Sequence, residues 1–526
     1  MKKTLIDEVP LIDVEENQTK KNWHRTRNQW GAIDKLFKPH NKYEDSTTPE
    51  KGFEPGLAGL QEIVQRAVAD NKVIRAYGSR WSLNNIAFTN HYLIDSSALD
   101  YCLVGLSDPS HVNPEFEAKR NRFAFVQCGV MVKDLNQKLQ EQQLALPTSG
   151  ASDGQTFVGA ASTGTHGAAH SVGSMQDYVR GIHLVTLADE CVFVQRESEP
   201  VITEAFCAWL GDTKLVQDDD LFNAALVSFG SYGVVHGLLI ETEPLYLLER
   251  FIKNCDFDEV KNAICTLDMT GLGLPKGDEL PFHFEVAVNP YFLEAGKKGA
   301  FVRVLYKSEY TPERAALRKN TAVNLENDLI DGIGRWFDPV KWLIPKGLQI
   351  ALELSFPVSP PGELEVGFPG DQFGNASSSD PTSPSPLPGT SIEIGVPFER
   401  IEDAMNLIFS VTEKHVFGAP LAFRYVKNSS ATLAFTKYAP ITVTLEMPGL
   451  DDNLADEGHQ AIFEALAASD IPHTYHWGQR MPANTEWVAT SYGEEVVEGW
   501  KQQRSELLGE QGCELFSNEL MKKIGL

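Results

Sequence analysis

The stretch TSGASDGQTFVGAASTGTHGAAHSVG, residues 148–173, says more about the fold class of this chain than any other. Gly, Ala, Ser and Thr outnumber all other residues in it. A main chain with so few bulky side chains can approach a bound group closely and offer it N–H donors. The stretch therefore suits a phosphate or a polar heteroaromatic ring, although an ordinary glycine-rich surface loop has a similar composition.

A second stretch, VIRAYGSRWS at residues 73–82, is a short apolar run that ends in a Gly/Ser turn. It directly follows an amphipathic segment, Leu57 to Ala69, whose apolar residues recur at helical spacing: Leu60, Ile63, Val64 and Ala67. This order predicts a helix, then a strand, then a turn large enough to hold an anion.

Together the two stretches resemble the flavin domain of the FAD-linked oxidases of the vanillyl-alcohol oxidase and p-cresol methylhydroxylase (PCMH) type. In that family a strand ending in Gly-x-Gly-His-Ser and a later Thr-Gly-Thr-His-Gly loop bracket the FAD. GSRWS at 78–82 and TGTHG at 163–167 occupy those places, and a third segment, Gly230 to Val235, is similar to the family's run past the adenine end of FAD. The resemblance implies that FAD is bound by Tyr77, Gly78, Ser79, Arg80, Trp81, Ser82, Ser149, Gly150, Gly159, Ser162, Thr163, Gly164, Thr165, His166, Gly167, Gly233, Val234 and Val235.

Composition indicates a soluble globular protein of two or three domains. The chain has 526 residues, of which 42% are hydrophobic and 22% charged, and its formal net charge is −26. This charge argues against nucleic acid or an anionic membrane surface as a partner. No run of eighteen apolar residues predicts a transmembrane segment, and the start lacks the apolar core of a signal peptide, so we expect a cytoplasmic protein.

Metal chemistry is not expected from the sequence. The seven cysteines are scattered and contain no Cys-x-x-Cys pair, so we expect reduced, mostly buried thiols. His166 and His170 have the spacing of two zinc ligands on a helix, but Gly164 and Gly167 disfavour a helix there.

The predicted fold is α+β, with a two-part FAD-binding domain of the PCMH type and a substrate (cap) domain built on an antiparallel sheet. We expect an N-terminal arm over residues 1–50, the FAD-binding domain over 51–247, the cap domain over 248–465, and a segment over 466–526 that returns to the FAD domain. Residues 357–390, rich in Pro, Ser and Gly, predict a mobile loop, either a surface insertion or a lid. The apolar, aromatic segment 335–354 is core, a wall for a non-sugar substrate, or a membrane-surface contact.

Near the C-terminus, PHTYHWGQ at 472–479 and GCELFSN at 512–518 resemble signatures of the aldonolactone and alditol oxidases, which are one branch of the family. Three positions depart from the family. Trp81 replaces the histidine that is often joined to the flavin, so we expect non-covalent FAD. Ala422 replaces the carboxylate of the family's Glu-x-Arg, and Gln479 replaces a lysine.

The resemblance implies Arg424, Gln479 and His476 as catalytic residues, and Glu446 is a candidate for the missing carboxylate. Arg424 would stabilise negative charge on the reduced flavin or an alkoxide. His283 and Glu285 would point to the same side of a strand, as an ordinary polar face or as part of the pocket.

The function that follows is oxidation of a CH–OH group in a small-molecule substrate, by hydride transfer to flavin N5, with O2 or another electron acceptor. A hydrophobic non-sugar alcohol or related C–H substrate is an alternative. Because positions 422 and 479 are changed, a catalytically inactive flavin-fold binding protein is another.

Overall fold

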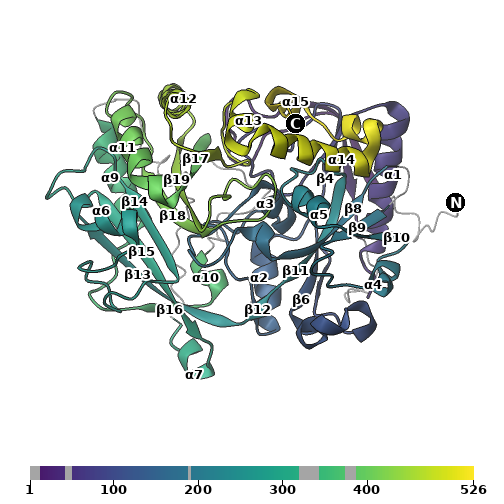
Figure 1. Cartoon of the computed structure of the whole chain (residues 1–526), viewed down its shortest axis with the longest axis horizontal. Coiled ribbons are helices and arrows are strands. Elements are labelled where there is room, and N and C mark those ends of the chain that lie inside the picture. The colour runs from purple at the N-terminus through teal and green to yellow at the C-terminus, as the bar shows by residue number, and fades with distance from the viewer. Residues whose placement is uncertain (1–11, 42–49, 188–190, 319–342, 374–386) are drawn as a thin grey trace.

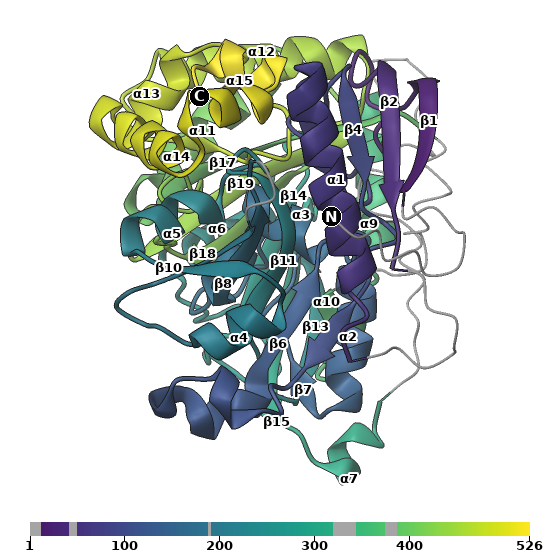
Figure 2. The same ribbon diagram turned by 90° about the vertical axis from the view of Figure 1, so that its right-hand side faces the viewer.

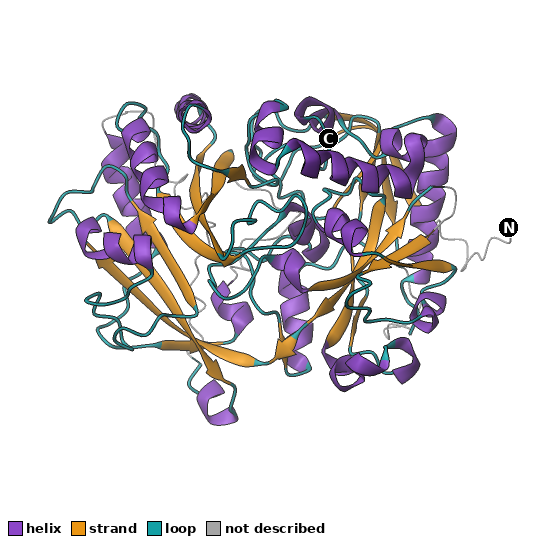
Figure 3. Ribbon diagram, viewed as in Figure 1, coloured by secondary structure: helices purple, strands orange, loops and turns teal. Residues whose placement is uncertain are grey.

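The computed structural model describes residues 12–41, 50–187, 191–318, 343–373 and 387–526. Two lobes lie side by side (Figure 1); the first contains a four-stranded and a six-stranded sheet, and the second an eight-stranded sheet. One lobe holds the early strands of the chain and the other the strands from β13 onward, while the last helices lie over the first lobe (Figures 1 and 3). None of the helices built from the described residues is both long and apolar enough to cross a lipid bilayer.

The first sheet contains four strands in the order β1-β2-β4-β3. Their bounds are β1 Ile12–Thr19, β2 Ala32–Pro39, β3 Ile74–Tyr77 and β4 Tyr92–Asp95. Helix α1 (Glu54–Asp70) buries the predicted apolar face and ends at Asn71, which adopts a left-handed conformation with φ of 51°. Part of the expected N-terminal arm is thus a pair of strands, since β2 pairs with β4 beside α1 (Figure 2). The alternating residues of β1 and β2 were not recognised as strand patterns because many of them are charged.

The second sheet contains six strands in the order β10-β9-β8-β11-β6-β5. Their bounds are β5 Cys102–Val104, β6 Phe123–Gln127, β8 Val179–Val185, β9 Cys191–Gln195, β10 Thr213–Gln217 and β11 Val234–Glu241. Helices of the same lobe are α2 Val132–Glu141, α3 Phe157–Thr163, α4 Glu204–Trp209 and α5 Asp219–Leu226, and the short strands β7 Leu144–Ala145 and β12 Glu243–Pro244 pair beside them.

The second lobe is built on an eight-stranded sheet in the order β16-β13-β15-β14-β18-β19-β17-β20, in which every pairing is antiparallel. This confirms the α+β prediction. The bounds are β13 Tyr246–Cys255, β14 His283–Val288, β15 Ala300–Glu309, β16 Glu365–Gly367, β17 Gly389–Pro397, β18 Leu421–Lys427, β19 Ile441–Leu450 and β20 Thr474–Tyr475.

The two faces of this sheet have different chemistry, because side chains alternate along a strand. Phe284, Val286 and Val302 face the main core, with α6 (Phe257–Thr266) and α11 (Ile401–Thr412). On the other face Ala287 and Phe301 pack against α9 (Ile344–Ser355). The charged residues Glu285 and Arg303 share that second face by strand parity, so the polar site and α9 lie on the same side of the sheet.

Two expectations for the middle of the chain are changed. Residues 365–373, inside the expected mobile loop, form β16 and α10 (Pro369–Phe373), because β16 pairs with β13. Residues 374–386 of that loop lie outside the described residues. Of the apolar segment 335–354, residues 335–342 also lie outside them, and the rest forms most of α9, whose inner face is core.

The C-terminal residues contact both lobes. Strand β20 extends the eight-stranded sheet, after α12 (Asn453–Ala467). The helices α13 (Glu486–Tyr492), α14 (Glu494–Leu515) and α15 (Glu519–Ile524) then lie over the first lobe (Figure 1). Trp500 of α14 donates its indole N–H to the carbonyl of Ala224 in α5 over 2.9 Å.

Candidate active site

A single pocket is lined by residues of both lobes and of the C-terminal segment. It runs past the turn after β3, the helix α3 and the start of β11, and it reaches the charged face of the eight-stranded sheet. Most of the predicted cofactor residues line it: Tyr77, Gly78, Ser79, Arg80, Trp81, Ser82, Gly159, Ser162, Thr163, Thr165, His166, Gly233, Val234 and Val235. The predicted catalytic residues Arg424, Glu446, His476 and Gln479 line the same pocket.

Four predicted cofactor residues, Ser149, Gly150, Gly164 and Gly167, are not among the residues that line the pocket. Packing accounts for two of these glycines. A Cβ on Gly167 would lie 2.7 Å from the carbonyl oxygen of Ser149, and one on Gly150 would lie 2.8 Å from Thr165. Gly164 ends α3 with φ of 86°, a conformation that favours glycine. These three glycines therefore shape the loop through packing and backbone conformation.

The two glycine-rich stretches interlock. Thr156 begins α3, where its hydroxyl accepts a hydrogen bond from the N–H of Gly159 over 3.3 Å. A Cβ on Gly78 would overlap the Thr156 side chain. The turn after β3 can therefore approach α3 only because residue 78 is glycine.

Trp81 lies at the pocket, where it packs against another indole. Its ring stacks on that of Trp23, with centroids 4.6 Å apart, and the ring of His24 packs edge-on against both. The indole nitrogen of Trp81 is buried and has no hydrogen-bond partner among the described residues. Trp23 comes from the loop between β1 and β2, so the N-terminal segment helps to form this wall of the pocket.

Arg75 was missed by the sequence analysis, although it lies within the quoted stretch 73–82. Its buried guanidinium donates to four main-chain carbonyls from three parts of the chain: those of Phe229 and Gly230, of Phe516 and of Ile86. Asn518 in the C-terminal segment donates to three carbonyls, those of Asn85, Ile86 and Phe88, each over 2.9 Å. These donors hold the C-terminal segment against loops that line the pocket.

Strand register brings the charged residues together. Glu285 of β14 lies directly between Arg303 of β15 and Arg424 of β18. Two residues further along, on the same face, Ala422 of β18 lies opposite Glu446 of β19, which lies opposite Glu393 of β17. Residues that lie opposite or diagonal to each other on neighbouring strands are close enough for long side chains to touch.

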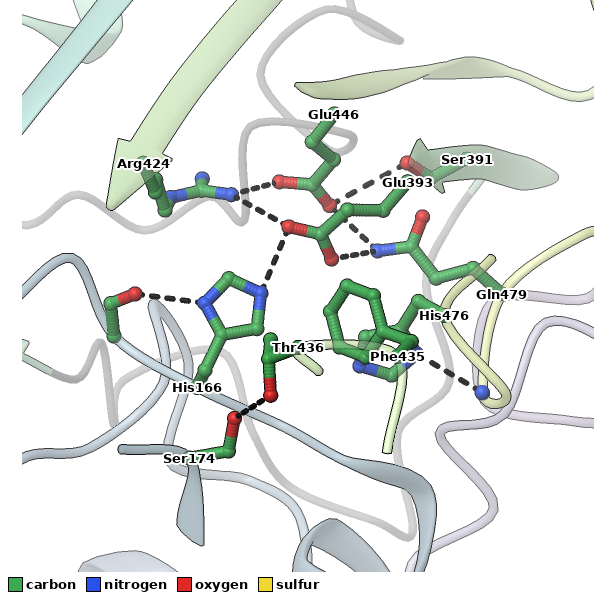
Figure 4. Close-up of polar contacts among 12 residues, drawn as sticks. His166, Ser174, Ser391, Glu393, Arg424, Phe435, Thr436, Glu446, His476 and Gln479 are labelled. Atoms are coloured by element: carbon green, nitrogen blue, oxygen red, sulfur yellow. Dashed lines mark hydrogen bonds and ion pairs between the residues drawn. The ribbon is translucent and has the colours of Figure 1, made fainter. Parts of the chain in front are cut away.

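Arg424 is surrounded by three carboxylates, of which Figure 4 shows Glu446 and Glu393. Its Nε is 2.8 Å from Glu285, and its Nη1 contacts Glu446 and lies 3.6 Å from Glu393. Ala422 supplies no carboxylate, but Glu446 directly opposite it reaches the same guanidinium. The sequence proposed Glu446 for this place, whereas Glu393 was missed because its pairing depends on register.

The charges of this group perturb one another. Burial alone would raise the pKa of Glu285, but the guanidiniums of Arg303 and Arg424 outweigh burial and hold that pKa well below its usual range. Burial would likewise lower the pKa of Arg424, but Glu446, Glu285 and Glu393 together raise it. Glu285 and Arg424 are therefore both charged in the folded protein. His283, on the same strand as Glu285, is buried but does not line the pocket.

Gln479 links two of the carboxylates. Its amide nitrogen donates to Glu446 over 2.8 Å and to Glu393 over 3.2 Å, while its amide oxygen is buried with no partner among the described residues (Figure 4). The two carboxylates fix the orientation of the amide, because only its NH2 end can donate to them.

His476 is a neutral donor in this geometry. Burial lowers its pKa to about 4, and its Nδ1 accepts a hydrogen bond from the N–H of Gly478 over 2.9 Å. The neutral ring therefore carries its proton on Nε2. The carbonyl of the same Gly478 accepts from the N–H of Leu83 over 2.7 Å, which joins this loop to the turn after β3.

The pocket fits a cofactor with polar edges such as FAD. Buried atoms that line it lack a partner within the described part of the chain, among them Trp81 Nε1, Gln155 Oε1 and Gln479 Oε1. Gly230 also lines the pocket with φ of 73°, and a Cβ there would meet no atom within 4 Å, so its backbone is open to a bound group. The described residues contain no group of three or more potential metal ligands.

Comparison with known proteins agrees with this arrangement. Residues 57–194 match the family model of an FAD binding domain. An L-gulono-1,4-lactone dehydrogenase of Mycobacterium tuberculosis is 26% identical over 287 residues, which are 54% of this chain and 56% of that protein. A D-arabinono-1,4-lactone oxidase of Debaryomyces hansenii is 26% identical over 213 residues, which are 40% of this chain and 35% of that protein. The match thus spans about half of the first relative and about a third of the second.

Two solved structures share the fold over almost the whole chain. A cholesterol oxidase from B. sterolicum has a TM-score of 0.67 at 13% identity and covers 98% of both chains. A solvent-stable cholesterol oxidase has a TM-score of 0.68 at 12% identity and covers 99% of both. The matched domain and the interlocked glycine-rich turns lead to one assignment: residues 57–194 form an FAD-binding domain of the p-cresol methylhydroxylase type, in a chain whose two-lobed fold is shared with these two oxidases.

Proposed function

We propose that this protein is an FAD-dependent oxidoreductase that oxidises a CH–OH group of a neutral small molecule. The observation that carries the proposal is the position of the charged cluster, which ends a pocket whose other walls are the FAD-binding turns. FAD, when bound, would supply the two-electron oxidant. The chain would supply the substrate contacts and the group that takes the hydroxyl proton.

Charge pairing supports a neutral substrate. Arg303 pairs with Glu285 over 2.6 Å, Arg424 pairs with Glu285 and Glu446, and Glu393 lies 2.9 Å from His166. A carboxylate or an ammonium group on the substrate would enter this site without a free counter-charge, at a large desolvation cost. A hydroxyl can instead accept from a donor such as His476 and donate to a carboxylate.

Glu446 is our candidate for the proton acceptor. Its side chain is 15% exposed, compared with 3% for Glu285 and 4% for Glu393, so it is the carboxylate of the cluster most open to the pocket. As the C–H electron pair leaves for the cofactor and the C=O bond forms, the O–H proton would move to this carboxylate. General-base assistance of this kind contributes about 10²- to 10⁴-fold.

By name, one of the relatives above is an aldonolactone oxidase and the other an aldonolactone dehydrogenase. The proposed electron acceptor is therefore O2 first, with another electron acceptor as the second candidate. A hydrophobic alcohol is the second candidate substrate, because Phe356 and Pro448 also line the pocket. The seven free cysteines support a reducing compartment, and we propose the cytoplasm.

The test is a flavin spectrum followed by an anaerobic substrate screen. The purified protein should be yellow, or become yellow with added FAD, and the colour should bleach with one of a set of neutral polyols, lactones and sterol-like alcohols. The matching sugar acids and amino alcohols should fail. Bleaching by an acid instead of its neutral counterpart would contradict the neutral-substrate proposal. A colourless protein that takes up no FAD would support the alternative of a binding protein without catalysis.

The role of Glu446 has its own variant. Glu446→Gln should slow anaerobic reduction about 10²- to 10⁴-fold with unchanged flavin content. Glu365→Gln is the matched control, since Glu365 pairs with Arg250 in the same sheet and does not line the pocket. Equal rates in the Glu446→Gln variant and the wild type would exclude Glu446 as the base.

A further inference from the structure

His166 of the glycine-rich loop makes two hydrogen bonds that together restrict its protonation. Its Nδ1 is 2.7 Å from the carbonyl oxygen of Gly167. A carbonyl can only accept, so Nδ1 must carry a proton. Its Nε2 is 2.9 Å from Oε1 of Glu393, and the two side chains are only 3% and 4% exposed. One proton must therefore lie between Nε2 and Oε1, because otherwise two lone pairs would face each other in a buried site.

The neighbours of Glu393 decide which atom holds that proton. Gln479 donates to Oε2 of Glu393, and Arg424 Nη1 lies 3.6 Å from Oε1, the same oxygen that faces His166. Both contacts favour the carboxylate form. Burial alone would raise the pKa of Glu393, but the neighbouring His166, His476 and Arg424 together outweigh burial and lower it. The proton therefore belongs to the histidine ring.

The remaining surroundings of His166 do not compete for the proton. Phe435 packs against the ring with centroids 5.3 Å apart, and behind it His476 lies with its centroid 6.3 Å from that of His166 (Figure 4). His476 is neutral, because burial lowers its pKa to about 4. The charged groups that face the pair are those of the cluster already described, Arg424 and, through Gln479, Glu446.

We propose that Glu393 is a positioning residue that keeps His166 doubly protonated and so fixes a positive charge on the glycine-rich loop at the pocket. His166 lies within the segment that matches the FAD binding domain and lines the pocket. The effect of this charge rests on the proposed function. FAD becomes more negative when it gains electrons, so a fixed cation beside it would stabilise the reduced form.

The first measurement is the protonation of the ring itself, in protein without substrate and with or without FAD. Protein labelled with ¹⁵N-histidine is recorded at pH 7.5, and a His166→Gln variant assigns the signal. Both ring nitrogens of His166 should have imidazolium shifts in the wild type and in Glu393→Asp. Glu393→Gln should convert the ring to the neutral form with its proton on Nδ1. A neutral ring in the wild type would overturn the proposal.

The second measurement is the midpoint potential of bound FAD, with Glu446→Gln as the matched variant. Both substitutions replace one cluster carboxylate near Arg424 by an amide, but only Glu393 touches His166. Glu393→Gln should lower the potential by about 30 mV or more, which is a tenfold change for a two-electron couple. Glu446→Gln removes a negative charge without removing a proton, so it should raise the potential. A rise in both variants would mean that His166 keeps its proton without Glu393, against the proposal.

The two proposals can fail separately. If the protein binds no FAD, the proposed function fails while the ring shifts still report the state of His166. If FAD binds and substrate bleaches it but the wild-type ring is neutral, the proposed function stands and the role of Glu393 fails.

Discussion

Replacing Arg424 by Met should destabilise the second lobe strongly. The Arg424 side chain is only 9% exposed and contacts Glu285, Glu446 and Glu393. Glu285 would keep Arg303, and Glu393 would keep His166 and Gln479, but Glu446 would lose its only cationic partner among the described residues. Removing one partner of a buried ion pair costs about 3 to 5 kcal/mol.

The loss can be measured as a change in thermal midpoint. For a lobe of about 200 residues, 3 to 5 kcal/mol corresponds to a fall in Tm of roughly 6 to 20 °C. Circular dichroism of the FAD-loaded and FAD-free protein at pH 7.5 would report it in both states. Arg303→Met is the matched control, since it contacts Glu285 alone within the cluster and leaves Arg424 in place. Its Tm should fall by less.

A second substitution separates charge from packing. In Arg424→Met with Glu446→Gln, no charged Glu446 remains to be left unpaired, so part of the lost Tm should return. The reasoning would be refuted if Arg424→Met unfolds within about 2 °C of the wild type. It would also be refuted if adding Glu446→Gln lowers the Tm further, because the carboxylate would then not be the source of the instability.

Three further predictions follow from the pocket. Because Trp81 offers no nucleophilic ring nitrogen, FAD should be bound non-covalently. Acid precipitation should then leave the yellow colour in the supernatant. A tryptic peptide that carries the mass of the flavin would contradict this prediction. Gly78→Val should abolish FAD binding, because a side chain at position 78 overlaps Thr156. The control Gly499→Ala, which has open space around it, should bind FAD normally. Wild-type flavin content in soluble Gly78→Val protein would show that the contact with Thr156 is not the reason for glycine at this position. The folded-state pKa of Glu285 lies below 4.5, so the unfolded chain binds more protons below about pH 4.5, and stability should fall as the pH falls through that range. In an acid titration of Tm, Glu285→Gln should reduce this loss of stability. A Tm profile identical to that of the wild type would count against the charged cluster as the source of the pH dependence.

Local patterns were sufficient for the elements near the cofactor. The apolar spacing of residues 57–69 predicted α1, which runs from Glu54 to Asp70, because one side of a helix must be apolar to pack on a sheet. The turn after β3 and the loop before β8 could be recognised because their glycine content is itself the constraint: Gly78 leaves room for Thr156, and Gly164 ends α3. The C-terminal signature likewise marked the loop that contains His476 and Gln479.

Sequence patterns did not predict the strands whose residues are mostly charged or lie among Pro, Ser and Gly. The many charged residues in β1 and β2 concealed two strands whose pairing with β4 is long-range. The Pro, Ser and Gly content of 357–390 concealed β16, which is ordered by its pairing with β13 rather than by its own composition. The sequence pattern indicated only that Arg75 belongs to a strand, although its guanidinium donates to carbonyls from three other parts of the chain.

The sequence by itself determined the class of fold, the FAD-binding turns and four of the residues at the far end of the pocket, because those depend on residue type over short distances. Only the tertiary structure decided how the charges meet. Arg303, Glu285 and Arg424 share one row of the sheet, and Glu446 and Glu393 share the next, because of strand register. Register depends on strand pairing, which for Glu285 and Arg424 joins residues 139 apart in the sequence, and a shift of one residue would turn every one of these side chains to the other face. The contact between Glu393 and His166, which joins the two lobes across 227 residues of sequence, is the clearest example.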